Sequence, residues 1–116
     1  MRNNEQLATK LFELSVDNSH THTFFVNSGT EAIETAMKVT LQYWQELGQP
    51  DKRHFISRWK SYHGITVGAL SLSGHAIRRQ RFEIGLEKYP ALYGDLENDS
   101  IETLTSEFVE AIEKTG

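Results

Sequence analysis

The chain contains no cysteine among its 116 residues, which excludes disulfides and thiolate metal ligands. Long apolar runs are also missing, and none approaches the roughly eighteen residues that a membrane span needs. The residues after Met1 form no apolar stretch of the kind found in secretory signals. These absences favour a cytoplasmic protein, and we expect no membrane as a partner.

An excess of basic charge is missing as well. Lys and Arg total 12 against 16 Asp and Glu, which leaves a formal net charge of −4. This balance argues against nucleic acid as the main partner. Apolar residues make up 38% and charged residues 24%, an ordinary globular composition. A chain of this length is one domain or part of one.

The most informative stretch is an apolar segment that ends abruptly in small polar residues. Residues 23–26 are aromatic or β-branched and predict a buried strand. The turn at residues 27–31, here called the phosphate turn, contains Ser28, Gly29 and Thr30. Apolar residues then recur at helical spacing as far as Leu47, and Gly48 stands where a helix-ending glycine belongs. A helix N-terminus with free N–H groups suits a phosphate or another dianion. An ordinary helix cap remains an open alternative at this point.

A second polar turn follows a second predicted strand, residues 54–59. Strand, helix and strand in this order predict a βαβ unit with a parallel sheet. The turn at residues 61–64, here called the aromatic turn, contains Tyr62 and His63. Ligands of open α/β sheets lie beyond the carboxyl ends of the strands. A flat aromatic ligand with a phosphate would use both turns, with its ring stacked on Tyr62.

Other segments are predicted from apolar spacing and turn residues. Helices are expected over residues 5–15, 65–72 and 101–112, with a turn at residues 17–20 and an irregular segment at 83–94. Asp99 and Glu102 have capping-box spacing, with Asp99 as the cap. The basic patch Arg78, Arg79 and Arg81 is expected to face solvent or another subunit. His20 and His22 lack a suitably spaced third ligand, so no metal site is expected.

Two motifs carry a resemblance to a known family. Val-Asn-Ser-Gly-Thr-Glu-Ala at residues 26–32, followed by Glu34, Ala36 and Lys38, resembles the cofactor-phosphate segment of class III aminotransferases. Tyr-His-Gly at residues 62–64, continued by a Gly-Ala-Leu-Ser run to Gly74, is similar to the next block of that family. These are pyridoxal-phosphate (PLP) enzymes of the aspartate aminotransferase-like fold, type I. The resemblance implies a three-layer α/β/α fold with a mainly parallel sheet.

The resemblance also implies roles for individual residues. Gly29 and Thr30 would bind the PLP phosphate through backbone N–H groups and the Thr30 hydroxyl, and Ser28 would line the same turn. Tyr62 would stack on the pyridine ring, and His63 would shape the pocket beside it. The roles of Glu31 and Glu34 stay open, although Glu31 in the first helical turn favours the helix dipole.

The catalytic groups of the family have no counterpart in this chain. The lysine that forms a Schiff base with PLP, and the aspartate that pairs with the pyridinium nitrogen, come much later in such enzymes. None of the lysines lies in that motif: Lys10, Lys38, Lys52, Lys60, Lys88 and Lys114. Where the family usually has proline after Phe82, this chain has Glu83. We therefore interpret residues 1–116 as a single partial domain, the central part of a PLP-binding large domain, and predict that it is inactive alone.

The expected activity of the parent is transfer of an amino group from an amine or amino acid to a 2-oxo acid or aldehyde. The resemblance implies a homodimer. Two alternatives remain open at this stage. An aminomutase, racemase or decarboxylase of the same fold would use the same turns, and a truncated, non-catalytic interaction module would use neither for catalysis.

Overall fold

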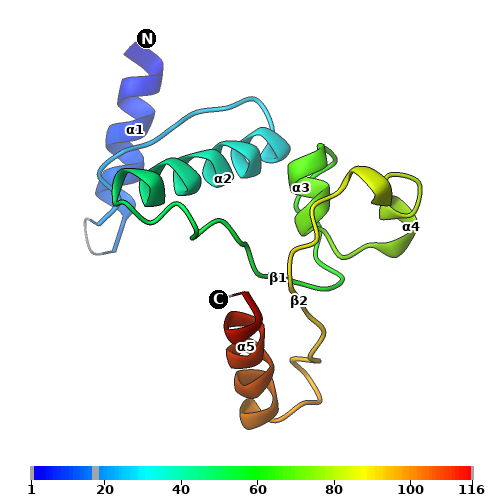
Figure 1. Cartoon of the computed structure of the whole chain (residues 1–116). Coiled ribbons are helices and arrows are strands. Elements are labelled where there is room, and N and C mark those ends of the chain that lie inside the picture. Colours follow the sequence, from blue (N-terminus) through cyan, green and yellow to red (C-terminus); the bar gives the residue numbers. More distant parts are fainter. Residues whose placement is uncertain (1, 17–18, 116) are drawn as a thin grey trace.

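The computed structural model describes residues 2–16 and 19–115. The predicted turn at residues 17–20 therefore lies partly outside the described residues, at Asp17 and Asn18. Helices dominate the chain and strands are short (Figure 1). In chain order the elements are α1 (Arg2–Leu14), α2 (Gly29–Glu46), β1 (Ser57–Arg58), α3 (Val67–Leu72), α4 (Ala76–Arg79), the 3₁₀ helix η1 (Glu83–Gly85), β2 (Ala91–Leu92) and α5 (Ile101–Thr115).

The two strands pair in parallel, with Ser57 opposite Ala91 and Arg58 opposite Leu92. The Trp59 N–H extends the pairing by donating to the Leu92 carbonyl over 2.7 Å. Parallel pairing was predicted and is confirmed, although β2 lies in the segment that was expected to be irregular. With two residues in each strand, the sheet of the described residues is too small to form the expected three layers. That architecture stays a prediction.

The predicted strand at residues 23–26 is wrong for this structure. The segment is coil, and it has no partner strand among the described residues (Figure 1). A strand forms only where another strand accepts its N–H and C=O groups. Phe24 is left 75% exposed. The βαβ unit predicted from this segment is therefore absent from the described residues.

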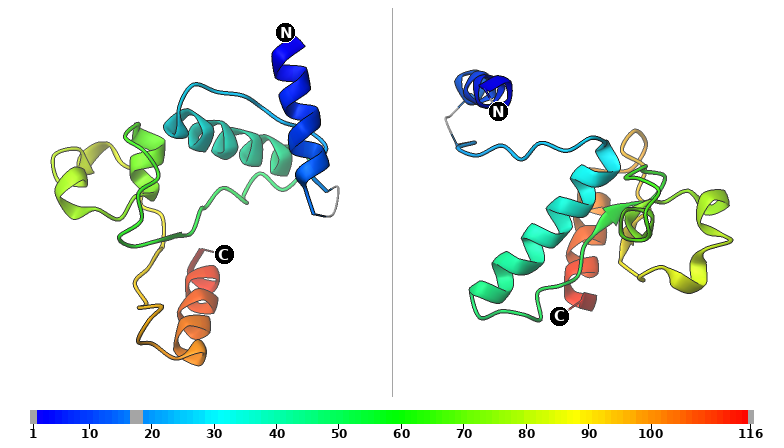
Figure 2. Two further views of the ribbon diagram at one scale, coloured as in Figure 1. Left: turned by 180° about the vertical axis from the view of Figure 1, so that it is seen from behind. Right: turned by 90° about the horizontal axis from the view of Figure 1, so that it is seen from above.

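The buried part of the molecule is centred on α3. Ala69, Leu70 and Leu72 of this helix are buried, together with Met37 of α2. The N-terminal end of α2 meets α3, while α1 and α5 extend away from this centre (Figure 2). The radius of gyration is 17.0 Å, against about 13 Å for a compact domain of this length. The core is therefore small for the chain, and most large apolar side chains outside it are exposed.

Helix ends test the predicted capping residues. Gly48 has a φ of +71°, the left-handed conformation expected of a glycine after a helix. Asp99 was predicted to cap α5, which is wrong. Ser100 is the cap, because its Oγ accepts the Thr103 N–H over 3.2 Å, whereas the Asp99 carboxylate accepts the Asp95 N–H over 2.7 Å.

Among the helices described, none has the length and apolar character needed to cross a membrane.

Candidate functional site

The phosphate turn is a capping box at the start of α2. Ser28 is the N-cap, with extended backbone at φ −150° and ψ 161°. Its Oγ accepts the Glu31 N–H over 3.2 Å and donates to Glu31 Oε2 over 3.0 Å. The Asn27 N–H donates to the same oxygen over 3.0 Å. This reciprocal arrangement gives Glu31 a defined role in closing the turn. The Ser-x-x-Glu spacing at 28–31 is visible in the sequence.

Two backbone donors at the helix start are left over by the cap. Within the described residues, the N–H groups of Gly29 and Thr30 have no hydrogen-bond partner. The space beside Gly29 is open, since a Cβ added there would meet no atom within 4 Å. Unpaired N–H groups at the positive end of an 18-residue helix are donors of the kind that favour an anion. Ser28, by contrast, is already occupied by the cap.

The aromatic turn lies between β1 and α3 and presents a partly open ring. Tyr62 is 52% exposed. The Arg78 guanidinium carbon lies 4.9 Å from the centre of the Tyr62 ring, and the His75 ring lies 6.4 Å from it. A cation over an aromatic face is attracted by the ring quadrupole. His63 is fixed through its backbone, because its N–H donates to Ser73 Oγ over 2.9 Å.

A close contact joins the two turns. Gly64 has a φ of +142°, and a Cβ added there would lie 2.7 Å from Thr30 Oγ1 and 2.8 Å from the Ala69 Cβ. Glycine is required here by both the conformation and the space. The Thr30 side chain of the phosphate turn thus lies against the backbone of the aromatic turn at Gly64, although residues 32–60 separate the two turns in the sequence.

Glu34 strengthens this connection and was not assigned a role from the sequence. Its Oε1 accepts the Ala69 N–H over 3.0 Å and also a short hydrogen bond from the Thr66 hydroxyl. Thr66 is the N-cap of α3 but makes no side-chain cap of its own, so Glu34 caps α3 from α2. The sequence could not predict this role, because the hydrogen-bond partner Thr66 lies 32 residues away from Glu34 and no local spacing indicates the pair.

Arg79 holds the other end of α3. The sequence predicted an exposed basic patch, and for Arg79 this is wrong, because the residue is 9% exposed. One guanidinium nitrogen donates to the carbonyls of Leu70, Ser71 and Ser73 over 2.8 to 3.0 Å. A helix leaves its last carbonyls unpaired, and here Arg79 satisfies them. The ion pair with the half-exposed Glu83, at 3.3 Å, contributes little beyond this.

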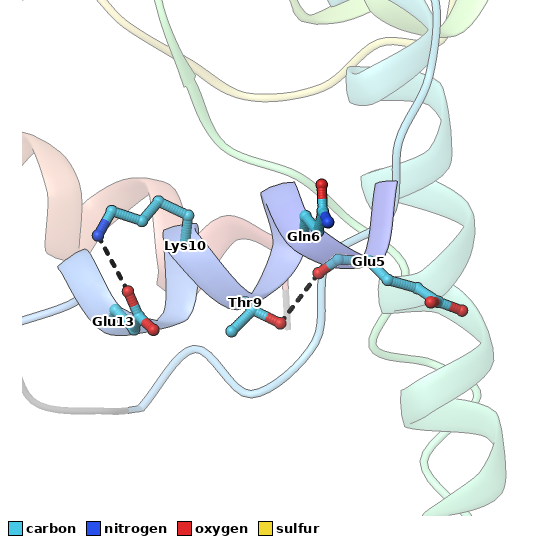
Figure 3. Close-up of a pocket in the computed structure, with 5 residues that line it drawn as sticks. All are labelled: Glu5, Gln6, Thr9, Lys10 and Glu13. Atoms are coloured by element: carbon cyan, nitrogen blue, oxygen red, sulfur yellow. Dashed lines mark hydrogen bonds and ion pairs between the residues drawn. The ribbon is translucent and has the colours of Figure 1, made fainter. Parts of the chain in front are cut away.

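One groove on the surface of α1 is lined by no residue of either turn. Figure 3 shows this groove, where Thr9 donates to the Glu5 carbonyl and Lys10 pairs with Glu13 at 3.0 Å. All five residues that line it come from the same helix, so no second element completes a site. In the described part of the chain, no group of three or more His, Asp or Glu side chains could hold a metal ion.

Tyr89 and Asp95, both outside the turns, have shifted pKa values. Burial, and then the charges of Glu87 and Glu34, raise the pKa of Tyr89. Hydrogen bonds from the Asn98 side chain and the Glu97 N–H lower the pKa of Asp95. Neither residue lies in the phosphate turn or the aromatic turn, so these shifts describe local structure.

Comparison with known proteins places this geometry among aminotransferases. A family model described as Aminotransferase class-III matches residues 1–116, and the chain belongs to that family. It is 48% identical over 120 residues to an uncharacterized aminotransferase, YodT, of Bacillus subtilis, covering 97% of this chain and 27% of the relative. It is 45% identical over 78 residues to gamma aminobutyrate transaminase 3 of Solanum lycopersicum, covering 67% of this chain and 15% of the relative.

Solved structures agree with the sequence relatives. A PMP-bound aminotransferase from Vibrio fluvialis matches with a TM-score of 0.87 and 28% identity, over 100% of this chain and 27% of that one. An omega-aminotransferase from Paracoccus denitrificans matches with a TM-score of 0.86 and 29% identity, over 100% and 28%. The chain thus spans between 15% and 28% of the length of these proteins. Members of the class III family use pyridoxal phosphate.

Proposed function

We propose that these residues form the phosphate and ring subsite of a PLP-dependent aminotransferase. The observation that carries the proposal is the contact between Gly64 and Thr30, 2.7 Å from an added Cβ to Thr30 Oγ1. It joins an anion-binding helix start to an accessible aromatic ring. A cofactor that combines a phosphate with a flat heteroaromatic ring requires both features in one place.

The residues present fit such a cofactor. The unpaired N–H groups of Gly29 and Thr30 would bind the phosphate, with the Thr30 hydroxyl beside them, and open space at Gly29 gives access. Tyr62 would stack on the ring, with the Arg78 guanidinium over one face of the Tyr62 ring. Ser28 and His63 would act mainly through the cap and the backbone bond that hold each turn.

The chemistry that PLP supplies when bound is withdrawal of electrons from the substrate carbon that carries the amino group. The role of this chain is to bind and orient. Fixed N–H donors would stabilise the phosphate charge, and Tyr62 would restrict tilting of the ring. We propose that the lysine and the aspartate of the family lie outside these 116 residues, so the chain alone would not catalyse transfer.

The complete protein would transfer an amino group from an amine or amino acid to a 2-oxo acid or aldehyde. We further propose that it is a cytoplasmic homodimer. Support for the reaction comes from the match of the family model over residues 1–116 and from relatives that are themselves named transaminases.

The test uses the complete protein encoded by the reading frame that contains these residues. It is incubated with PLP, an amine donor and either pyruvate or 2-oxoglutarate, and the products are separated by chromatography. A new amino acid formed from the 2-oxo acid supports the proposal, and Tyr62→Ala should reduce its rate at least about tenfold.

Other products would replace the proposal. Racemised, decarboxylated or internally rearranged substrate, without a new amino acid, would indicate a racemase, decarboxylase or aminomutase of the same fold. No reaction and no PLP binding by the complete protein would contradict the proposal and favour a non-catalytic interaction module.

A further inference from the structure

We infer that Glu34 is a positioning residue that sets the distance between the phosphate turn and the aromatic turn. The inference rests on the proposed function, because the two turns matter together only for a ligand that spans them. Glu34 lies on α2, one helical turn after the capping box of Ser28 and Glu31. It belongs to the same rigid helix as the phosphate-binding N–H groups.

The partners of Glu34 lie on the other side of the site. Its Oε1 receives hydrogen bonds from the Thr66 hydroxyl and from the Ala69 N–H at 3.0 Å. Thr66 is the N-cap of α3 and Ala69 lies in its first turn, and the aromatic turn ends three residues before this helix begins. A carboxylate that accepts N–H groups at a helix start is stabilised by the helix dipole as well as by the hydrogen bonds.

The surroundings of the carboxylate leave it little freedom. A Cβ added at Gly68 would lie 2.6 Å from Glu34 Oε1 and 2.7 Å from Oε2. The absence of a side chain at Gly68 therefore allows Glu34 to approach the backbone of α3. Because α3 has only six residues and is too short to be stable alone, its position depends on such contacts.

Glu34 can position the two turns without binding a ligand itself. Glu34 contacts neither the free N–H groups of Gly29 and Thr30 nor the Tyr62 ring in the described structure. Its loss would change how far apart the two turns lie, not the donors within either turn. A ligand that uses both turns gains from their fixed separation, whereas a ligand that uses one turn does not.

The experiment compares two probes on the cofactor-free complete protein. Pyridoxamine phosphate requires both turns and cannot form a bond with a lysine, and its affinity is measured by fluorescence titration. Inorganic phosphate requires only the phosphate turn, and its affinity is measured by competition. Glu34→Ala should weaken pyridoxamine phosphate about tenfold, the loss expected for a charged hydrogen bond. It should leave phosphate affinity within about twofold.

Conservative variants distinguish positioning from general damage. Glu34→Gln keeps an acceptor oxygen and should restore pyridoxamine phosphate affinity to within about threefold of the original. Thr66→Val removes one donor with little change of shape and should give an intermediate loss. Glu46→Ala, an exposed residue at the far end of α2, is the matched control and should change neither affinity.

Two results would overturn the inference alone: unchanged pyridoxamine phosphate affinity in Glu34→Ala and Thr66→Val, or equal weakening of both probes. If Glu34→Ala does not fold, Thr66→Val and Glu34→Gln still give the comparison. Failure of the unsubstituted protein to bind pyridoxamine phosphate would instead overturn the proposed function, and this inference with it.

Discussion

Gly64 packs directly against the side chain of Thr30, so that an added Cβ would lie 2.7 Å from Thr30 Oγ1. The contact joins the aromatic turn to the start of α2. It brings together two motifs that are separated in the sequence by most of α2 and by β1. The effects of this contact, and of the caps around it, on stability and ligand affinity can be measured.

Gly64→Ala should destabilise the protein and weaken cofactor binding. Alanine would meet both a positive φ of +142° and the Thr30 side chain, at a cost of about 1 to 3 kcal/mol. Denaturant unfolding and pyridoxamine phosphate titration measure the two effects. Gly85→Ala is the control, because a Cβ there would meet nothing within 4 Å. Equal stability of the two variants would contradict the close packing.

Arg79→Ala should cost about 3 kcal/mol or more, since it leaves the buried carbonyls of Leu70, Ser71 and Ser73 without their shared donor. The midpoint of denaturant unfolding measures the loss. Arg81→Ala, at an exposed position nearby, should stay within about 0.5 kcal/mol of the original. An equal loss of stability in the two variants would contradict the buried position of Arg79.

Ser28 is expected to matter for stability more than for phosphate affinity. Ser28→Ala removes the acceptor of the Glu31 N–H and should cost about 1 kcal/mol, whereas Ser28→Gly should cost only a few tenths. Because the free donors belong to Gly29 and Thr30, phosphate affinity should change less than about threefold in either variant. A loss of phosphate binding without a loss of stability would make Ser28 a direct ligand.

Asp95 should titrate below its ordinary pKa of 3.8, because the Asn98 side chain and the Glu97 N–H stabilise its charged form. A pKa that is lowered in the folded state stabilises the protein above the ordinary value, and this contribution is lost as pH falls through the folded pKa. NMR of the carboxyl carbon measures the midpoint. Asn98→Ala should raise it, while Asn4→Ala on α1 should not. A midpoint at or above 3.8 in the unsubstituted protein would refute the hydrogen-bonded arrangement.

Local sequence signals predicted those parts of the structure that depend on local interactions. The helical spacing after Thr30 and the glycine at 48 predicted α2 and its end, because both follow from backbone conformation and side-chain periodicity. Parallel pairing was also predicted, though with the wrong first strand. Residues 23–26 have the composition of a strand, but composition cannot supply the partner that a strand needs.

Contacts between distant residues could not be predicted in this way. Arg79 looked like part of a basic surface patch, and only the fold shows that its guanidinium reaches the end of α3. Glu34 lay in the family-like motif without a role, because its partner Thr66 is 32 residues away. At the start of α5, Asp99 and Ser100 are both residue types that cap helices well. The helix begins at Ile101, one residue later than a cap at Asp99 requires, so Ser100 is the cap.

The most direct test of the central claim is an absorbance titration of the complete protein with PLP. The account predicts a visible band from bound cofactor in the unsubstituted protein. Thr30→Ala and Tyr62→Ala should each raise the dissociation constant at least about tenfold, while Glu46→Ala should leave it unchanged. No bound cofactor, or equal affinity in all of these variants, would contradict the claim that the two turns form a PLP site.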